Sequence, residues 1–168
     1  MADFGDEFAE VEVFEIRQDR RNEVAVVLLK DVASDLFLPI WIGELEAVSM
    51  EIALTRRTPP RPMTHDLLKS VISELGGDLV RVEIDRLVDQ TYFASLIISQ
   101  GEEEISIDCR PSDGINLAIR MGRPILAHRS LLQELHPSGR EEEAEPEELD
   151  EGDFREFLKR ISPSDFES

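Results

Sequence analysis

Alternating apolar and polar residues predict most of the strands in this chain. Residues 10–17 mix acidic and basic side chains with apolar ones at a spacing near two, which is typical of a strand with one buried face. Residues 24–29 are continuously apolar, and the polar turn between the two segments predicts a hairpin. Five more segments carry strand patterns: residues 36–42, 78–87, 91–99, 103–108 and 124–127. Short polar connections predict an antiparallel meander over residues 78–108.

Helical periodicity predicts three helices and a closing helical turn, at residues 43–55, 64–75, 112–121 and 131–135. Thr64 and Ser112 are the predicted N-caps of the second and third helices, and Gly76 and Gly122 are their predicted stops. The same periodicity leaves His65 exposed. The apolar positions expected to face the core in the first two helices are Leu45, Val48, Ile52, Leu54, Leu67, Leu68, Val71, Ile72 and Leu75.

These elements predict one α+β domain with a mixed, largely antiparallel sheet flanked by helices. We expect an N-terminal tail at residues 1–9, this domain at 10–136, an acidic linker at 137–152 and a C-terminal amphipathic helix at 153–168. In the last segment an apolar stripe recurs at helical spacing, through Phe154, Phe157, Leu158 and Ile161. A helix this short is marginal alone, so we expect it to bind either its own domain or another protein.

The composition is that of an ordinary soluble protein. Of its 168 residues, 41% are hydrophobic, which is enough for one sizeable core. No apolar run approaches the roughly 20 residues of a membrane span, and the acidic N-terminus lacks the basic start of a secretory signal. We therefore expect a cytoplasmic protein with no membrane partner. Cys109 is the only cysteine, which excludes an intramolecular disulfide and predicts a buried, inert thiol.

The net charge of −19 argues against general affinity for nucleic acids, because that affinity depends on Lys and Arg contacts with phosphates. Residues 139–168 contribute −8, so −11 remains on residues 1–138. A nucleic-acid surface must therefore be local. The competing interpretation of any basic patch is solvated charge, or ion pairs with the surplus acids. The candidates are Arg56, Arg57 and Arg61 around a proline-rich loop, joined by Arg110, Arg120, Arg123 and Arg129.

Polar side chains concentrate between a predicted strand end and a helix start in residues 105–120. Proline at 111 ends the strand, because it has no backbone N–H. In one interpretation Ser112 caps the helix, Asp113 interacts with the helix dipole and Arg110 neutralises an acid. In the other, the carboxylates of Asp108 and Asp113, the Arg110 guanidinium and the Asn116 amide bind a divalent cation or a phosphate. The spacing alone leaves both interpretations open.

The same segment carries a family resemblance. Residues 108–113, Asp-Cys-Arg-Pro-Ser-Asp, followed by Leu117-Ala118, resemble the signature of the bifunctional nuclease family. Gly114 stands where the family more often has alanine. The resemblance implies an α+β domain, commonly a homodimer, with nuclease activity on DNA and RNA described for some plant members. Three further segments agree with it: residues 39–43 with Glu44 and Glu46, residues 61–67 and residues 92–94.

The first functional hypothesis is metal-assisted phosphodiester hydrolysis, in which Mg²⁺ or another divalent cation polarises the phosphate and no organic cofactor takes part. Asp108, Asp113 and Glu44 would hold the metal. The same two aspartates are also candidate catalytic residues, together with Arg110, which would stabilise developing charge, and His65, which would activate water. Arg56, Arg57, Arg61 and Arg120 would bind the substrate, single-stranded DNA or RNA.

The competing hypothesis is a non-catalytic, dimeric regulatory or protein-binding module, in which residues 108–113 only stabilise the fold. Geometry discriminates between the two. Carboxylates that converge on an open cleft favour the enzyme, whereas carboxylates committed to salt bridges and backbone caps favour the module.

Overall fold

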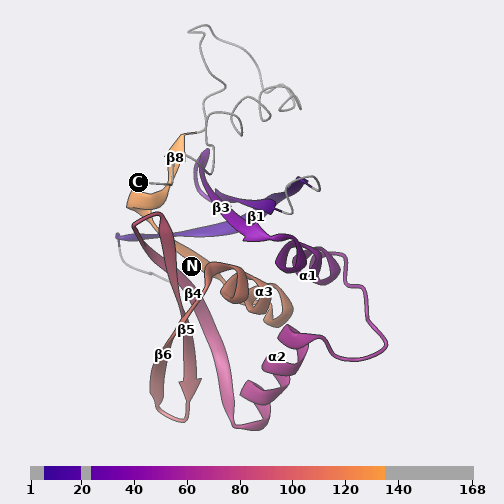
Figure 1. Ribbon diagram of the computed structural model, residues 1–168. Helices are drawn as coiled ribbons and strands as arrows, with labels where there is room; N and C mark the ends of the chain where they lie inside the picture. Colours follow the sequence, from indigo (N-terminus) through magenta and orange to yellow (C-terminus); the bar gives the residue numbers. More distant parts are fainter. Residues whose placement is uncertain (1–5, 20–23, 135–168) are drawn as a thin grey trace, which may run out of the picture. The chain divides into compact units, whose positions relative to one another are not determined.

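One sheet organises the part of the chain that the computed structural model describes, residues 6–19 and 24–134 (Figure 1). Its seven longer strands lie side by side in the order β6-β5-β4-β7-β1-β2-β3. The predicted α+β class, with a mixed and largely antiparallel sheet, is confirmed. The bounds of these strands are β1 Phe8–Asp19, β2 Val24–Asp31, β3 Leu36–Gly43, β4 Gly77–Val88, β5 Thr91–Gln100, β6 Glu103–Cys109 and β7 Ile125–His128.

Two antiparallel meanders make up the sheet, and β7 joins them. β1 pairs with β2 and β2 with β3, while β4 pairs with β5 and β5 with β6, as the hairpin patterns predicted. Ile125 of β7 lies opposite Val11 in an antiparallel pairing and opposite Val82 in a parallel one. The β4–β5 turn has Asp89 and Gln90 at φ values of 45° and 63°, the left-handed conformations that a two-residue hairpin requires.

The chain separates into one compact unit, Met1–Gln133, and a second, Glu134–Ser168. The predicted acidic linker and C-terminal helix lie outside the described residues. Near the end of the described part, the predicted helical turn at residues 131–135 is wrong. A short 3₁₀ helix spans Arg129–Leu131 instead, and Gln133–Glu134 form the two-residue strand β8.

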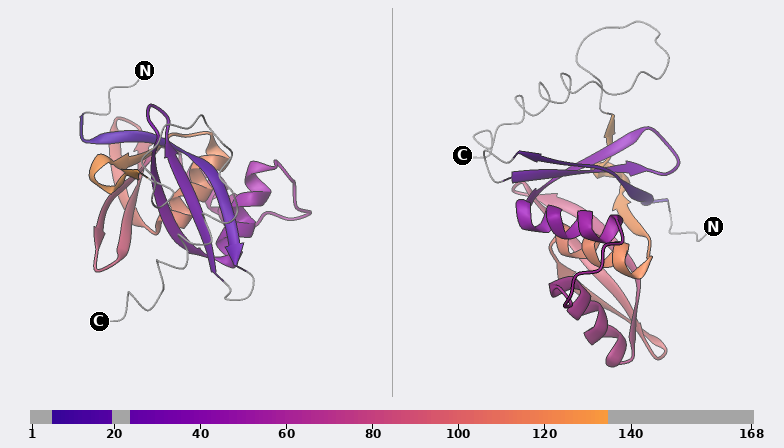
Figure 2. Two further views of the ribbon diagram at one scale, coloured as in Figure 1. Left: turned by 90° about the horizontal axis from the view of Figure 1, so that it is seen from above. Right: turned by 90° about the vertical axis from the view of Figure 1, so that its right-hand side faces the viewer.

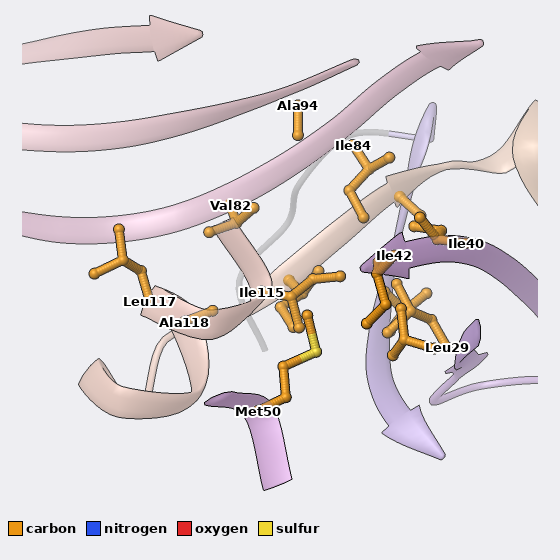
Figure 3. Packing of buried hydrophobic residues seen from close by; sticks show 14 of the residues in the cluster. Leu29, Ile40, Ile42, Met50, Val82, Ile84, Ala94, Ile115, Leu117 and Ala118 are labelled. Carbon is orange, nitrogen blue, oxygen red and sulfur yellow. The ribbon is translucent and has the colours of Figure 1, made fainter. Parts of the chain in front are cut away.

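Three helices lie in the angle between the two meanders (Figure 2): α1 Glu44–Leu54, α2 Thr64–Glu74 and α3 Pro111–Met121. The central helix is α3, which contacts α1, α2, β4 and β5. Met50 of α1 and Ile115 of α3 point toward each other beside Ile42, within the core that the helices and the sheet share (Figure 3). No helix in the described ranges is long and apolar enough to cross a bilayer.

The spans of the helices are as predicted, but two of the predicted caps are wrong. Arg110 is the N-cap of α3 and Pro111 its first residue, so Ser112 lies inside the helix. Proline takes this position because its fixed φ suits a helix start and its missing N–H needs no partner there. Thr64 is likewise the first residue of α2, after the N-cap Met63. The predicted stops are confirmed, since Gly76 and Gly122 have φ values of 78° and 62°.

The predicted inward faces of α1 and α2 are also wrong. Leu45 of α1 is 82% exposed, whereas the small residues Ala47 and Ser49 are buried beside Met50. In α2 only Ile72 and His65 are buried, so His65 is not the exposed side chain that the periodicity predicted. Four apolar residues of α2 face outward instead: Leu67, Leu68, Val71 and Leu75. Both helices turn polar side chains toward α3, and the spacing of apolar residues gives no indication of such a polar contact.

Gly114 lets α3 approach β4 closely. A Cβ at this position would lie 2.7 Å from Val82 Cγ1 and 3.4 Å from Cys109 Sγ. Val82 is fully buried, so it has little freedom to move aside. The valine at position 82 therefore leaves no room for a side chain at position 114.

We predict that Gly114→Ala lowers the free energy of unfolding by about 1 kcal/mol. Overpacking against Val82 costs about 1–3 kcal/mol, and the better helix propensity of alanine returns about 1 kcal/mol. Urea denaturation of Gly114→Ala, Val82→Ala and the double variant measures the coupling. The double variant should be more stable than the sum of the single effects implies, and strict additivity would contradict the close approach.

Candidate functional site

A network of polar side chains joins α1, α2 and α3, and we call it the three-helix polar cluster. It has an exposed side around the N-terminus of α3 and a buried side around Arg120. Its members are Glu46 and Ser49 from α1, His65 and Asp66 from α2, and Arg110, Asp113, Asn116 and Arg120 from α3 and its cap.

The exposed side is an ion-pair arrangement centred on Arg110. Its Nε and Nη2 donate to the two carboxylate oxygens of Asp113, at 2.7 and 3.0 Å, and its Nη1 donates to Glu46 Oε1 at 2.9 Å. The Arg110 side chain is 64% exposed, so solutes can reach this arrangement. The hydrogen bonds from Arg110, helped by His65, hold the pKa of Asp113 below its usual value, and the same carboxylate raises the pKa of Arg110. Asp113 is thus ionised at neutral pH.

The Glu46 carboxylate folds back over the start of its own helix. It lies in the space that a side chain at position 43 would take, so a larger residue there would displace the Glu46 carboxylate. An acidic group at a helix N-terminus is favoured by the helix dipole. The N-terminal ends of α1 and α3 therefore meet at Arg110.

The buried side is built around Arg120, whose side chain is only 6% exposed. Its Nε donates to Asp66 Oδ1 at 2.8 Å, its Nη1 to Asn116 Oδ1 at 2.7 Å, and its Nη2 to Ser49 Oγ at 3.0 Å. Asp66 also accepts the backbone N–H of Met63, which is the largest cause of its lowered pKa. Arg120 was predicted to bind substrate, but its three donor nitrogens point into the protein.

His65 connects the two sides. Its Nε2 lies 3.2 Å from Asp113 Oδ1, and its Nδ1 lies 3.1 Å from Ser49 Oγ. A carboxylate only accepts, so Nε2 carries the proton and donates to Asp113. The Ser49 hydroxyl already accepts from Arg120, and His65 Nδ1 is an acceptor within reach of its own hydrogen. These contacts assign a hydrogen to Nε2 and place Nδ1 beside the Ser49 hydroxyl.

This assignment changes the predicted role of His65. A general base needs a free lone pair within reach of the proton that it abstracts. The lone pair on Nδ1 faces the buried hydroxyl of Ser49, so His65 orients Asp113 and is not itself placed to activate water. Sequence reasoning did not identify Ser49, because a serine within a helix carries no spacing signal of its own.

The predicted metal-binding residues are not gathered at one place. Asp108 is exposed on the edge strand β6 opposite Ser95, and Glu44 is the first residue of α1. Across residues 6–19 and 24–134, no three His, Cys, Asp or Glu side chains form a group that could hold a metal ion. Cys109 is the last residue of β6 and is half-buried, not buried as predicted. Burial first, and then the charges of Asp113 and Asp108, raise the pKa of its thiol to about 12, which disfavours the reactive thiolate.

A basic cavity of about 490 Å³ lies at the C-terminal end of α1. It shares Asp66 and Arg120 with the three-helix polar cluster. Arg56 and Arg57, two of the predicted substrate-binding residues, lie at its rim, whereas Arg61 is exposed outside it. The lining consists of Ile52, Ala53, Leu54, Arg56, Arg57, Thr58, Asp66, Lys69, Ile119 and Arg120.

Comparison with known proteins finds matches over most of the chain. The sequence model of the bifunctional nuclease domain matches residues 27–138. An uncharacterized protein of Mycobacterium tuberculosis is 37% identical over 166 residues, which cover 95% of this chain and 98% of that protein. Bifunctional nuclease 2 of Oryza sativa subsp. japonica is 34% identical and Bifunctional nuclease 1 of Arabidopsis thaliana 33% identical, each over 110 residues. Both plant matches cover 64% of this chain and 34% of the plant protein.

We predict that Ser49→Ala lowers the free energy of unfolding by about 1–3 kcal/mol, because it leaves the buried Nδ1 of His65 without its hydrogen-bond donor. Urea denaturation measures this loss, and the nitrogen chemical shifts of His65 in isotope-labelled protein report which ring nitrogen is protonated. Both proteins should show the hydrogen on Nε2, because Asp113 remains its acceptor in the variant. Ser70→Ala, at an exposed serine of α2, is the control and should change stability by less than about 0.5 kcal/mol. A wild-type shift that places the hydrogen on Nδ1 would refute the assignment.

Proposed function

Because the chain belongs to the bifunctional nuclease domain family, we propose that it hydrolyses phosphodiester bonds in DNA and RNA. The observation that supports this most is the exposed arginine–carboxylate arrangement at the N-terminus of α3. A reachable guanidinium beside an ionised carboxylate combines a group that binds phosphate with a group that accepts a proton. By itself an ion pair of this kind favours the structural role of Asp113, but its side chain is 29% exposed, so the pair is open to solvent.

In this proposal Asp113 is the general base. It accepts a proton from the water that attacks phosphorus, while the bond from phosphorus to the leaving oxygen breaks and that oxygen takes a proton from solvent. Arg110 contacts the phosphate oxygens and stabilises the charge that develops on them. His65 is a positioning residue, because its Nε2–H fixes one oxygen of Asp113. Arg56, Arg57 and Arg61 contribute positive charge toward the phosphate backbone of a single strand.

We also propose that a divalent cation assists the reaction. Mg²⁺ is commonly bound through one or two carboxylates, together with waters and substrate phosphates, so it does not require a cage of three protein ligands. Asp113 is the one predicted ligand within the three-helix polar cluster, and Glu46 would be a second carboxylate if Arg110, which now donates to both, shifted toward the phosphate. A bound cation would supply Lewis-acid polarisation of the scissile phosphate.

We predict that Asp113→Asn reduces cleavage of labelled single-stranded DNA and RNA by about a hundredfold or more, the usual effect of removing a general base. Asparagine keeps the shape of the side chain but cannot accept the proton. Wild type and variant are purified in parallel and assayed with Mg²⁺ or with EDTA. Asp108→Asn should have a much smaller effect, because Asp108 lies outside the three-helix polar cluster.

Asp89→Asn is the matched control, since this carboxylate lies in the β4–β5 turn and asparagine tolerates its left-handed backbone. Cleavage by Asp113→Asn at the wild-type rate would overturn the proposed active site. Wild-type cleavage that persists in EDTA would overturn the role of the metal. The role of Asp113 would then be decided by the activity of Asp113→Asn.

The outward face of α2 supports a second function, that of a dimeric module. Leu67 is 58% exposed and Leu75 is 70% exposed, and they lie on the same face as Leu68 and Val71. Within residues 6–19 and 24–134 no other segment covers these side chains, and an exposed apolar helix face is typical of an interface. We propose that this face binds a second copy of the chain, so that the nuclease works as a homodimer.

We predict that Leu67→Glu/Val71→Glu converts a dimer to a monomer in light scattering coupled to size-exclusion chromatography. Burying each of these side chains contributes about 1.5–3 kcal/mol, so charges at both should weaken association at least a hundredfold. Leu87→Glu/Val88→Glu, at two exposed residues near the end of β4, is the control and should remain dimeric. A wild type that stays monomeric at micromolar concentration would exclude this interface.

A further inference from the structure

In the described ranges, three arginine side chains make no hydrogen bond or ion pair: those of Arg56, Arg57 and Arg61. This is unexpected in a chain with 37 acidic and 18 basic residues, where a carboxylate is seldom far away. All three lie in the connection between α1 and α2. Elsewhere in those ranges every arginine is paired with a carboxylate or a carbonyl, namely Arg17, Arg81, Arg86, Arg110, Arg120, Arg123 and Arg129.

Arg56 also has an unfavourable backbone conformation. It follows the C-cap Thr55 of α1 with φ of 52°, in the left-handed region where glycine is the usual residue. Its N–H donates to Ala53 O at 3.1 Å, and the N–H of Arg57 donates to Ile52 O at 3.0 Å, so the turn itself is well formed. A side chain in this conformation costs about 1 kcal/mol relative to glycine. The turn needs glycine-like geometry, yet the chain keeps a guanidinium there.

The helix dipole accounts for only part of this charge. One cation near the C-terminus of a helix is stabilising, and Arg57, the next residue, could provide it without the conformational cost. The negative end of the dipole amounts to about half an elementary charge. The positive charge of the three unpaired guanidinium groups is larger than the negative charge at the C-terminal end of α1.

The lining of the cavity beside these arginines combines two kinds of residue. Four are apolar, namely Ile52, Ala53, Leu54 and Ile119, and Arg56, Arg57 and Lys69 are basic. Lys69 Nζ donates to Arg120 O at 3.1 Å, which places a further positive charge beside the cavity. The one acidic side chain in the lining, Asp66, is already paired with Arg120 and capped by a backbone N–H. The cavity is therefore electropositive within an acidic protein.

We propose that this cavity binds a single nucleotide through its phosphate group. Arg56 and Arg57 contact the phosphate oxygens, and the apolar lining residues pack against the sugar and base. The volume of about 490 Å³ lies within the range of small-molecule sites, and a ligand with one charged group and a less polar body matches this mixed lining. The choice of a nucleotide as the ligand rests on the proposed nuclease function. Both a free nucleotide and the phosphorylated end of a single strand carry this chemistry.

The first experiment is calorimetric titration of the full-length chain, in EDTA at low salt, with adenosine 5′-monophosphate, adenosine and inorganic phosphate. Adenosine 5′-monophosphate should bind, its affinity should fall as salt rises, and adenosine should bind at least tenfold more weakly. Equal affinity for adenosine and its monophosphate would overturn the proposal. A short oligonucleotide with or without a 5′-phosphate then separates the two sources. If the oligonucleotide binds only with its 5′-phosphate, the ligand is the phosphorylated end of a strand. If only the mononucleotide binds, the ligand is a free nucleotide.

The sharper test is Arg56→Gly. This variant removes the guanidinium and also the conformational strain of a side chain in the left-handed region. The variant should lose about tenfold in affinity for adenosine 5′-monophosphate, as expected for a charge-assisted hydrogen bond, while its Tm stays the same or rises. Asp89→Gly is the matched control. It relieves a left-handed residue with φ of 45° outside the cavity and should bind like the wild type.

Unchanged affinity in both Arg56→Gly and Arg57→Ala would overturn the proposed site. Asp113→Asn separates this proposal from the proposed nuclease. That variant should bind adenosine 5′-monophosphate within about twofold of the wild type, because Asp113 does not line the cavity. Normal cleavage by Asp113→Asn, with Arg56-dependent binding retained, would overturn the active site and leave the nucleotide site standing.

Discussion

The buried guanidinium of Arg120 is the interaction on which the arrangement of the helices depends. A charge with a side chain only 6% exposed is tolerated when it is paired and its donors are satisfied. Each of the three helices supplies part of that requirement: Ser49 from α1, Asp66 from α2 and Asn116 from α3 itself. Removing one partner of such a pair typically costs about 3–5 kcal/mol, more than most single contacts in a domain of this size. The helices are therefore fixed by a polar seam as well as by the core beneath them.

This constraint explains why the apolar faces of α1 and α2 do not point where amphipathic periodicity places them. Each helix must turn its polar residues inward to reach Arg120 and Asp113, so the leucines on the opposite side turn outward. His65 is buried for the same reason, since it bridges Ser49 and Asp113. The outward apolar face of α2 is thus a consequence of the seam, and the surface proposed for dimerisation follows from the same burial of Arg120.

Periodicity predicted the elements well because strands and helices are determined locally. The hairpins, the helix spans and the stops at Gly76 and Gly122 depend on residues close in sequence, and all of these predictions are confirmed. The pairing of Arg110 with Asp113, three residues apart, was also within reach of sequence reasoning. The partners of Arg120 were not, because Asp66 and Ser49 lie 54 and 71 residues away. A single aspartate or serine so far away in the sequence has no local pattern that would indicate a contact with Arg120.

The contacts of Arg120 make one of the two proposed sites more rigid than the other. The residues of the proposed active site, Arg110 and Asp113, are attached to α3, whose position is fixed by Arg120, so their geometry would be set before a substrate binds. Arg56 and Arg57 lie in a connecting turn beyond the end of α1, and their side chains are free to adapt to a ligand. Arg120 belongs to both places, since it lines the cavity and supports the cluster. Its substitution would disturb folding, catalysis and binding together, and only the peripheral arginines can report on ligand binding alone.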